Sequence, residues 1–170
     1  MIFTQLNASH CQAYKKLMLM ATQESPFSWI TSHNEVRTLT EREMTEMLDH
    51  GQNESLINVG VLGTKKELIA CLSLAFATQH RLAHKATLHG LYVLPEFRRQ
   101  GIARELLTMC INSITEKPEV IYLDVTVVTA ALAARQFYRA TGFSSFALEP
   151  DAVKVGQHYY GLESLRMSVR

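Results

Sequence analysis

The chain has 170 residues, and 47% of them are apolar, which is enough to build one sizeable core. Lys and Arg (17) nearly balance Asp and Glu (16), so no strong field exists to attract nucleic acid or anionic lipid. No run approaches the roughly 18 apolar residues of a membrane span, and the first residues lack a signal-peptide pattern. We therefore expect a single domain over residues 1–170, with no nucleic-acid or membrane partner.

Three cysteines, Cys11, Cys71 and Cys110, lie far apart in the sequence. Neither a CxxC pair nor a Cys/His metal spacing occurs. Since free cysteines usually pack as small hydrophobic residues, we expect reduced thiols, a cytoplasmic protein and no metal site.

Residues 1–50 are typical of a short strand followed by helices. Apolar residues at helical spacing predict a helix over residues 10–24, which Pro26 ends. Thr40 with Glu43 three residues later predicts a capping box for a helix to about residue 50. A strand at 2–6 and a loop or broken helix at 27–39 complete this part.

From residue 55 the pattern changes to that of a sheet. Two apolar runs joined by a short polar turn predict a hairpin, and a helix follows Pro95. The expected strands are 55–63, 67–78, 84–94, 120–128 (buried on both faces), 143–148 and 158–169, with a second helix at 130–141. This order predicts an α/β fold with a mixed, mostly antiparallel sheet flanked by helices and one right-handed strand–helix–strand unit.

The segment most informative about chemistry is the turn between the 84–94 strand and the helix after it. Gly101 and Ala103 are small where this helix begins, so an anion could approach the free N–H groups of the first turn. Arg98, Arg99 and Arg104 would add charge-assisted contacts to phosphate oxygens. The turn lacks both the GxGxxG and the GK[ST] pattern. A pyrophosphate site is indicated, with a solvated helix cap as the alternative.

Two motifs resemble those of one family. Val93-Leu94-Pro95-Glu96-Phe97-Arg98-Arg99-Gln100-Gly101-Ile102-Ala103 is similar to the V-x-P-x-[YF] and R-x-x-G-x-[GA] signature of GNAT acetyltransferases, and Ala134-Arg135-Gln136-Phe137-Tyr138-Arg139-Ala140-Thr141-Gly142-Phe143 to their A-x-x-x-Y-x-x-x-G-F. The resemblance implies a GNAT fold, acetyl-CoA as cosubstrate, and direct transfer of its acetyl group to a primary amine of a small molecule or protein, without a metal.

The resemblance also implies roles for individual residues. The backbone N–H groups of Arg99, Gln100, Gly101, Ile102, Ala103 and Arg104 would hold the pyrophosphate, and Leu91 and Val93 would bind the pantetheine arm. The Val93 N–H would polarise the thioester carbonyl. Tyr138 would be the general acid that protonates the CoA thiolate. The alternative is that Tyr138 is simply a core aromatic residue.

Two positions depart from the family pattern. Ala131 stands where many relatives have Asn, and the 84–94 strand lacks the carboxylate that often serves as base. His89 lies on that strand and titrates near neutrality, so it is the first candidate base, ahead of Glu24, Asp124 or a water chain.

These departures keep two rival interpretations open. One is a catalytically silent CoA-binding sensor or assembly module, and the other is a transferase that uses a longer acyl-CoA. The sequence leaves the acceptor and the oligomeric state open, a homodimer included, and Phe27 and Trp29 would either line the acceptor pocket or cover the sheet.

Overall fold

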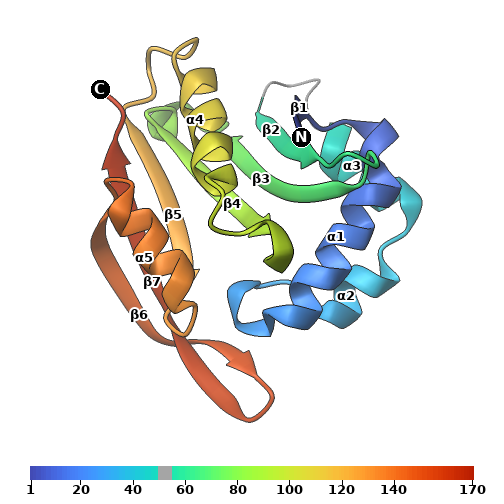
Figure 1. The fold of residues 1–170 in the computed structure, drawn as a ribbon. Helices are drawn as coiled ribbons and strands as arrows, with labels where there is room; N and C mark the ends of the chain where they lie inside the picture. The colour runs from blue at the N-terminus through green and yellow to red at the C-terminus, as the bar shows by residue number, and fades with distance from the viewer. Residues whose placement is uncertain (50–54) are drawn as a thin grey trace.

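The computed structural model describes residues 1–49 and 55–170, so the expected end of the second helix, at residue 50, lies outside them. The described residues form a seven-stranded sheet in the order β1-β2-β3-β4-β5-β7-β6 (Figure 1). The strands are β1 (Ile2–Gln5), β2 (Leu56–Leu62), β3 (Leu68–Phe76), β4 (Lys85–Val93), β5 (Tyr122–Val128), β6 (Ser144–Val155) and β7 (His158–Ser168). The α-helices are α1 (Cys11–Glu24), α2 (His33–Thr38), α3 (Glu41–Asp49), α4 (Ile102–Ile114) and α5 (Leu132–Ala140).

The sheet is mixed and mostly antiparallel, which confirms the predicted fold class. Only β4 and β5 pair in parallel, and α4 connects them. All other neighbouring strands pair antiparallel. The interrupted stretch after α1 contains a 3-10 turn at Pro26–Ser28 and then α2. This agrees with the expected loop or broken helix.

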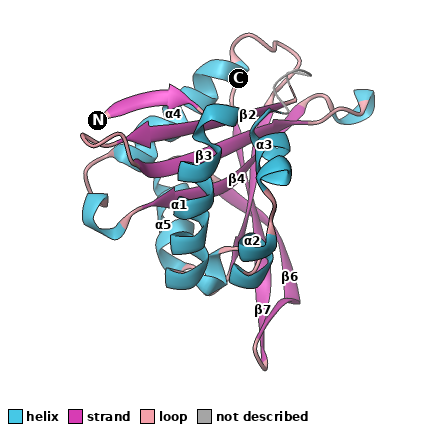
Figure 2. Ribbon diagram, turned by 90° about the vertical axis from the view of Figure 1, so that its right-hand side faces the viewer, coloured by secondary structure: helices cyan, strands magenta, loops and turns pink. Residues whose placement is uncertain are grey.

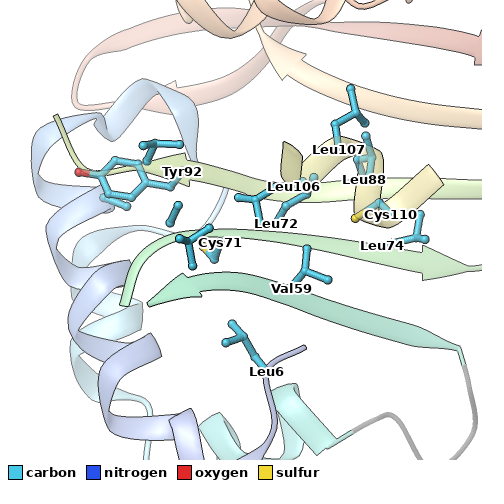
Figure 3. Packing of buried hydrophobic residues seen from close by; sticks show 14 of the residues in the cluster. Leu6, Val59, Cys71, Leu72, Leu74, Leu88, Tyr92, Leu106, Leu107 and Cys110 are labelled. Carbon is cyan, nitrogen blue, oxygen red and sulfur yellow. The ribbon is translucent and has the colours of Figure 1, made fainter. Parts of the chain in front are cut away.

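The two faces of the sheet are covered by different helices. Buried residues of α4, such as Leu106, pack against Leu72 of β3 and Leu88 of β4 (Figure 3). Cys71, next to Leu72 along β3, faces the opposite side, where α1 packs through Tyr14. Because successive strand residues point to opposite faces, β3 is buried from both sides, and it forms the centre of the core.

The prediction that residues 120–128 are buried on both faces was wrong. Leu123, Val125 and Val127 are buried on one face of β5, while Thr126 is exposed on the other. The helices α1 to α3 lie over the other half of the sheet (Figure 1). This face of β5 is therefore open at Thr126, although Val128, further along the same face, is buried.

The last hairpin is also longer than expected. β6 runs from Ser144 to Val155, and the hairpin extends past the helices (Figure 2). Pro150 in the middle of this run indicates a strand end, but β6 lies at the edge of the sheet, where a residue without an N–H group is tolerated. A register irregularity between Glu149 and Val153 accommodates the proline.

One buried carboxylate attaches α5 to the sheet. Glu163 of β7 is 3% exposed and accepts a 2.6 Å hydrogen bond from Arg135, while Arg139 makes a second ion pair with it. Burial by itself raises the pKa of Glu163, but the hydrogen bonds from Arg135 and Ser145 and the charges of both arginines outweigh it, so the net pKa is lowered. This anchor orients Tyr138, which lies on α5.

We expect Glu163→Gln to lower the free energy of unfolding at neutral pH by about 1–3 kcal/mol, because two guanidinium groups lose their charged partner. A lowered carboxyl pKa contributes stability above the unfolded value of about 4.3 and loses it as the pH falls through the folded value. The difference between wild type and variant should therefore shrink below about pH 4 in urea titrations. Glu46→Gln, which removes an exposed pair with Arg42, is the control and should match wild type. An equal difference at pH 7 and pH 3 would contradict this role for the carboxylate.

Candidate functional site

The site begins where β4 and β5 separate. Their parallel pairing covers only Lys85 to Leu88 of β4, opposite Tyr122 to Val125 of β5. The residues after Leu88 and after Val125 have no partner across this gap. Two neighbouring strands with unpaired backbone groups present those groups to a ligand, because a buried N–H or C=O needs a hydrogen-bond partner.

A bulge in β4 contributes to this separation. Ser73 of β3 pairs with His89 and Cys71 pairs with Tyr92, so Gly90 and Leu91 together oppose one residue. Gly90 has φ +65°, and a Cβ there would lie 3.3 Å from the ring of Trp29. Glycine at this position therefore allows both the bulge and the close approach of the indole.

A cavity of about 1400 Å³ runs through the gap. On one side it is lined by the turn before α4, by α5 and by the end of β4. On the other side it is lined by α1, by residues 28–31, and by the faces of β2 and β3 that α1 covers. Since a drug-sized ligand fills roughly 300–1,000 Å³, this volume has room for a long ligand and a second, smaller one.

The turn before α4 presents several backbone N–H groups without partners. Arg99 has φ +60° and Gly101 has φ +83°, an alternation of handedness that turns successive N–H groups toward one side. The helix starts at Gly101 without a side-chain cap. The Arg104 N–H donates to the Gly101 carbonyl (3.0 Å), which leaves the amides of residues 99–103 without an acceptor in the described chain. This arrangement favours an anion.

The three arginines of the turn differ in their contacts. The Arg98 guanidinium makes two hydrogen bonds to the Glu24 carboxylate (2.6 and 2.9 Å) and a third to the Val93 carbonyl (2.9 Å). It therefore joins the turn to the end of α1. The sequence led us to expect that Arg98 would extend toward the unpaired amides instead. Arg99 and Arg104 line the cavity, and their side chains have no ion pair within the described residues.

The strand register gives the direction of the Val93 amide. Val93 lies opposite Ala70, and the Leu94 N–H donates to the Ile69 carbonyl on β3 (2.9 Å). In an antiparallel pair of this type, the N–H of Val93 itself points away from β3. It therefore faces the gap toward β5, as expected of a group that binds a ligand there.

Tyr138 is 3% exposed and packs edge-on between Phe137 and Phe143. It also lines the cavity, beside Cys110 of α4. Its hydroxyl has no hydrogen-bond partner among the described residues. In that part of the chain, Glu67 carries the one fully enclosed side-chain oxygen without a partner, so the Tyr138 hydroxyl is not fully enclosed. The hydroxyl is thus open to the cavity, and burial raises its pKa well above the usual value.

His89 lies in a row of polar side chains across the sheet. The register places Asn58, Ser73 and His89 side by side on adjacent strands, and all three line the cavity. Ser73 donates to Asn58 (2.6 Å), which is buried and donates in turn to the Met47 carbonyl. His89 remains accessible to solvent, but the surrounding protein desolvates it enough to lower its pKa.

The two weaker base candidates are both bound by arginine. Glu24 accepts hydrogen bonds from Arg98 and from the Tyr92 hydroxyl (2.9 Å), and the Arg98 bonds are the main cause of its lowered pKa. Asp124 is held by two hydrogen bonds from Arg166 (2.6 and 2.7 Å). With its pKa lowered in this way, the Glu24 carboxylate is a poor proton acceptor near neutral pH.

The remaining residues singled out in the sequence are distributed as follows. Trp29 lines the cavity, whereas Phe27 packs on Tyr160 with ring centroids 5.0 Å apart. The three cysteines are buried and free, and burial raises the pKa of both Cys71 and Cys110 to about 12. Thiols with such pKa values are protonated and weak nucleophiles at neutral pH.

The roles of Tyr92, Asn58 and Ser73 in the cavity were missed. From the sequence, a tyrosine on a strand is interpreted as a core residue, and only the strand register shows that Asn58 and Ser73 lie next to His89.

In the described part of the chain no group of three His, Cys, Asp or Glu residues is arranged to hold a metal ion. Among the same residues, no helix has both the length and the apolar character needed to cross a membrane.

The fold is shared with solved structures that are named as acetyltransferases. A ribosomal-protein-alanine N-acetyltransferase from Brucella melitensis superimposes with a TM-score of 0.82 at 15% identity, over 99% of each chain. An N-acetyltransferase from Staphylococcus aureus Mu50 gives 0.85 at 12% identity, over 99% of this chain and 98% of the other. A Salmonella typhimurium structure named as an acetyltransferase with its cofactor acetyl-CoA gives 0.84 at 13% identity, over 100% and 94%.

Comparison with curated proteins gives no match. At the level of sequence, residues 17–143 match the acetyltransferase (GNAT) family. This is well over half of the chain and includes both motifs. The chain therefore belongs to the GNAT acetyltransferase family.

Proposed function

We propose that this protein transfers the acetyl group of acetyl-CoA directly to a primary amine. The observation that supports this best is the combination of unpaired amides at residues 99–103 with the adjacent gap between β4 and β5. The amides fit a diphosphate, and the gap fits an extended arm that hydrogen-bonds to an unpaired strand. The cavity then continues to the face of the sheet covered by α1, where an acceptor can enter.

Each part of the proposed site has its own role in binding acetyl-CoA. The amides of residues 99–103 hold the pyrophosphate, with the Arg99 and Arg104 side chains as further cations, while Leu91 and the Val93 amide bind the arm. The Val93 N–H stabilises the negative charge that grows on the thioester oxygen as the amine attacks. The contact of Arg98 with Glu24 and the Val93 carbonyl fixes the end of β4 in place.

Two protons must move. His89 accepts the proton of the ammonium, directly or through water, because its lowered pKa keeps the imidazole neutral near pH 7. Tyr138 donates a proton to the departing thiolate. The same dry surroundings that keep the phenol protonated also raise the proton affinity of the thiolate, so the transfer is favoured by burial of both groups.

The state of the cysteines bears on the cellular compartment of the protein. Three free, buried thiols in the described chain support a reducing compartment, and we propose the cytoplasm.

Replacing Gly101 tests the anion site. Gly101→Glu should weaken acetyl-CoA binding roughly tenfold or more, because the φ of +83° strains any other residue and a carboxylate would repel the phosphates. Isothermal calorimetry gives the affinity directly. Thr108→Glu adds the same charge about two turns further along α4, on its exposed side, and should bind like wild type. Equal affinity in the two variants would remove the anion site.

Replacing Tyr138 tests the general acid. Tyr138→Phe keeps the ring packing between Phe137 and Phe143 but removes the donor, so kcat should fall about a hundredfold with little change in acetyl-CoA affinity. Release of free thiol in the presence of an amine measures turnover. Tyr159→Phe, on the exposed side of the last hairpin, is the matched control. A Tyr138→Phe variant with the wild-type kcat would exclude the acid role.

Replacing His89 tests the base. Activity of the wild type should fall on the acidic side, through a pKa below the ordinary value of about 6.5, because protonated imidazole cannot accept a proton. His89→Gln should lower kcat and remove this limb from the pH profile, whereas the exposed His80→Gln should leave it unchanged. Retention of the same limb in His89→Gln would assign it to another group.

The catalytically silent sensor has two features in its favour. Ala131 starts α5 without a side-chain cap, and β4 has no carboxylate. A sensor would bind acetyl-CoA in calorimetry but release no free thiol with any amine, so the two assays together separate the interpretations.

A further inference from the structure

The Val93 amide lies at a place where β5 gives β4 no support. The parallel pairing of the two strands ends at Leu88 and Val125. On its other side, the end of β4 is held by β3 through the bond from the Leu94 N–H to the Ile69 carbonyl. Since the N–H and C=O of one extended residue point to the same side, both groups of Val93 face the gap. The direction of this amide therefore depends on contacts other than strand pairing.

Arg98 supplies a bond of the kind that a paired β5 would have supplied. Its Nε donates to the Val93 carbonyl (2.9 Å), so this carbonyl has a partner on the gap side. Its two terminal nitrogens donate to the two oxygens of Glu24 at the end of α1 (2.6 and 2.9 Å). Because the donors of a guanidinium lie in one rigid plane, a carboxylate held by two bonds sets the direction in which Nε points.

Tyr92 makes a second connection between Glu24 and the end of β4 (Figure 3). Its hydroxyl donates to Glu24 (2.9 Å), and the guanidinium carbon of Arg98 lies 5.6 Å from its ring centroid. Glu24 thus holds Tyr92 directly and Val93 through Arg98. The planar peptide group between Tyr92 and Val93 carries the Val93 N–H, so contacts on both sides of this plane fix how it is turned.

The same contact keeps Arg98 away from the proposed pyrophosphate site. A free guanidinium in this turn would extend to phosphate oxygens, which it binds well. The side chains of Arg98 and Glu24 are 41% and 36% exposed, and ion pairs with this exposure contribute little to folding stability. The effect of the pair is therefore mainly on the direction of Arg98, and its removal should leave the fold intact.

Resting on the proposed acetyl transfer, we infer that Glu24 is a positioning residue. Acting through Arg98 and Tyr92, it holds the Val93 N–H in the direction that polarises the thioester carbonyl of acetyl-CoA. The carboxylate itself touches neither the thioester nor the acceptor in this role.

The carbonyl stretch of bound acetyl-CoA tests this inference without an acceptor. A hydrogen bond to the thioester oxygen lowers the frequency of the stretch, and an isotope label on the acetyl carbonyl carbon separates its infrared band from those of the protein. In the wild type the band should lie below that of free acetyl-CoA. Glu24→Gln replaces one oxygen by an NH₂ group that cannot accept a bond from Arg98, so more than about half of this downshift should be lost.

Calorimetry of the same variant separates positioning from a general loss of structure. The pyrophosphate would be held by the amides of residues 99–103, and Glu24 bonds to none of these. A released Arg98 is also free to turn toward the phosphates. Glu24→Gln should therefore bind acetyl-CoA within about threefold of wild type.

Glu96→Gln is the matched control. Glu96 is an exposed carboxylate of the same turn, and within the described chain it makes no ion pair. The control should keep both the wild-type band position and the wild-type affinity.

Arg98→Lys tests whether geometry or charge is responsible. Lysine keeps the charge but cannot reproduce the planar two-bond contact with Glu24 while donating to the Val93 carbonyl. The downshift should fall to about the same extent as in Glu24→Gln. The double variant should lose no more than either single variant, because the two residues act in one chain of contacts. A larger loss in the double variant would contradict this chain.

The outcomes separate this inference from the proposed reaction. A downshift that is lost in Glu24→Gln while acetyl-CoA remains bound supports the inference. An equal downshift in wild type and Glu24→Gln, no downshift in the wild type, or loss of acetyl-CoA binding in Glu24→Gln overturns it, while thiol release with an amine still supports the transferase. If the band behaves as inferred but no amine gives thiol release, the positioning role stands and the proposed reaction is wrong.

Discussion

The separation of β4 from β5 after Leu88 and Val125 is the constraint on which the rest of the site depends. A sheet that stayed paired along this line would consume the amide of Val93 and close the passage between its two faces. The separation is built by a one-residue bulge in β4, which glycine permits at Gly90. It leaves backbone groups that no neighbouring strand pairs with and that are free to hydrogen-bond to a ligand.

Arginine–carboxylate pairs hold the walls of this opening in place. Arg98 joins the turn before α4 to the end of α1 through Glu24, so the two sides of the cavity share one contact. Glu163 attaches α5 to β7 through Arg135 and so orients the helix that bears Tyr138. The bidentate pair of Arg98 with Glu24 fixes direction as well as distance. Both contacts also pair the Glu24 and Glu163 carboxylates with guanidinium groups, so neither presents an unpaired negative charge.

Most of the fold could be predicted from the sequence because local signals there agree with the final structure. Helical spacing located α1 and α4, and apolar runs located β2 to β4. The errors come from long-range context. Thr126 is exposed because none of the α-helices in the described chain covers that face of β5, and β6 continues through Pro150 because it has no neighbour on one side. In the turn before α4, spacing identified the unpaired amides, whereas the partner of Arg98, 74 residues away in the sequence, has no local signal.

The irregularity in β6 has a consequence for encounters between copies of the protein. The outer edge of a sheet is a template on which another chain can add a strand, and natural proteins interrupt such edges to remain dispersed. In β6, Pro150 has no N–H to offer and Asp151 adopts a φ of +54°, so the outward ladder is broken near its middle. The β6 edge is therefore poorly suited to continuing the sheet from one copy of the protein to the next.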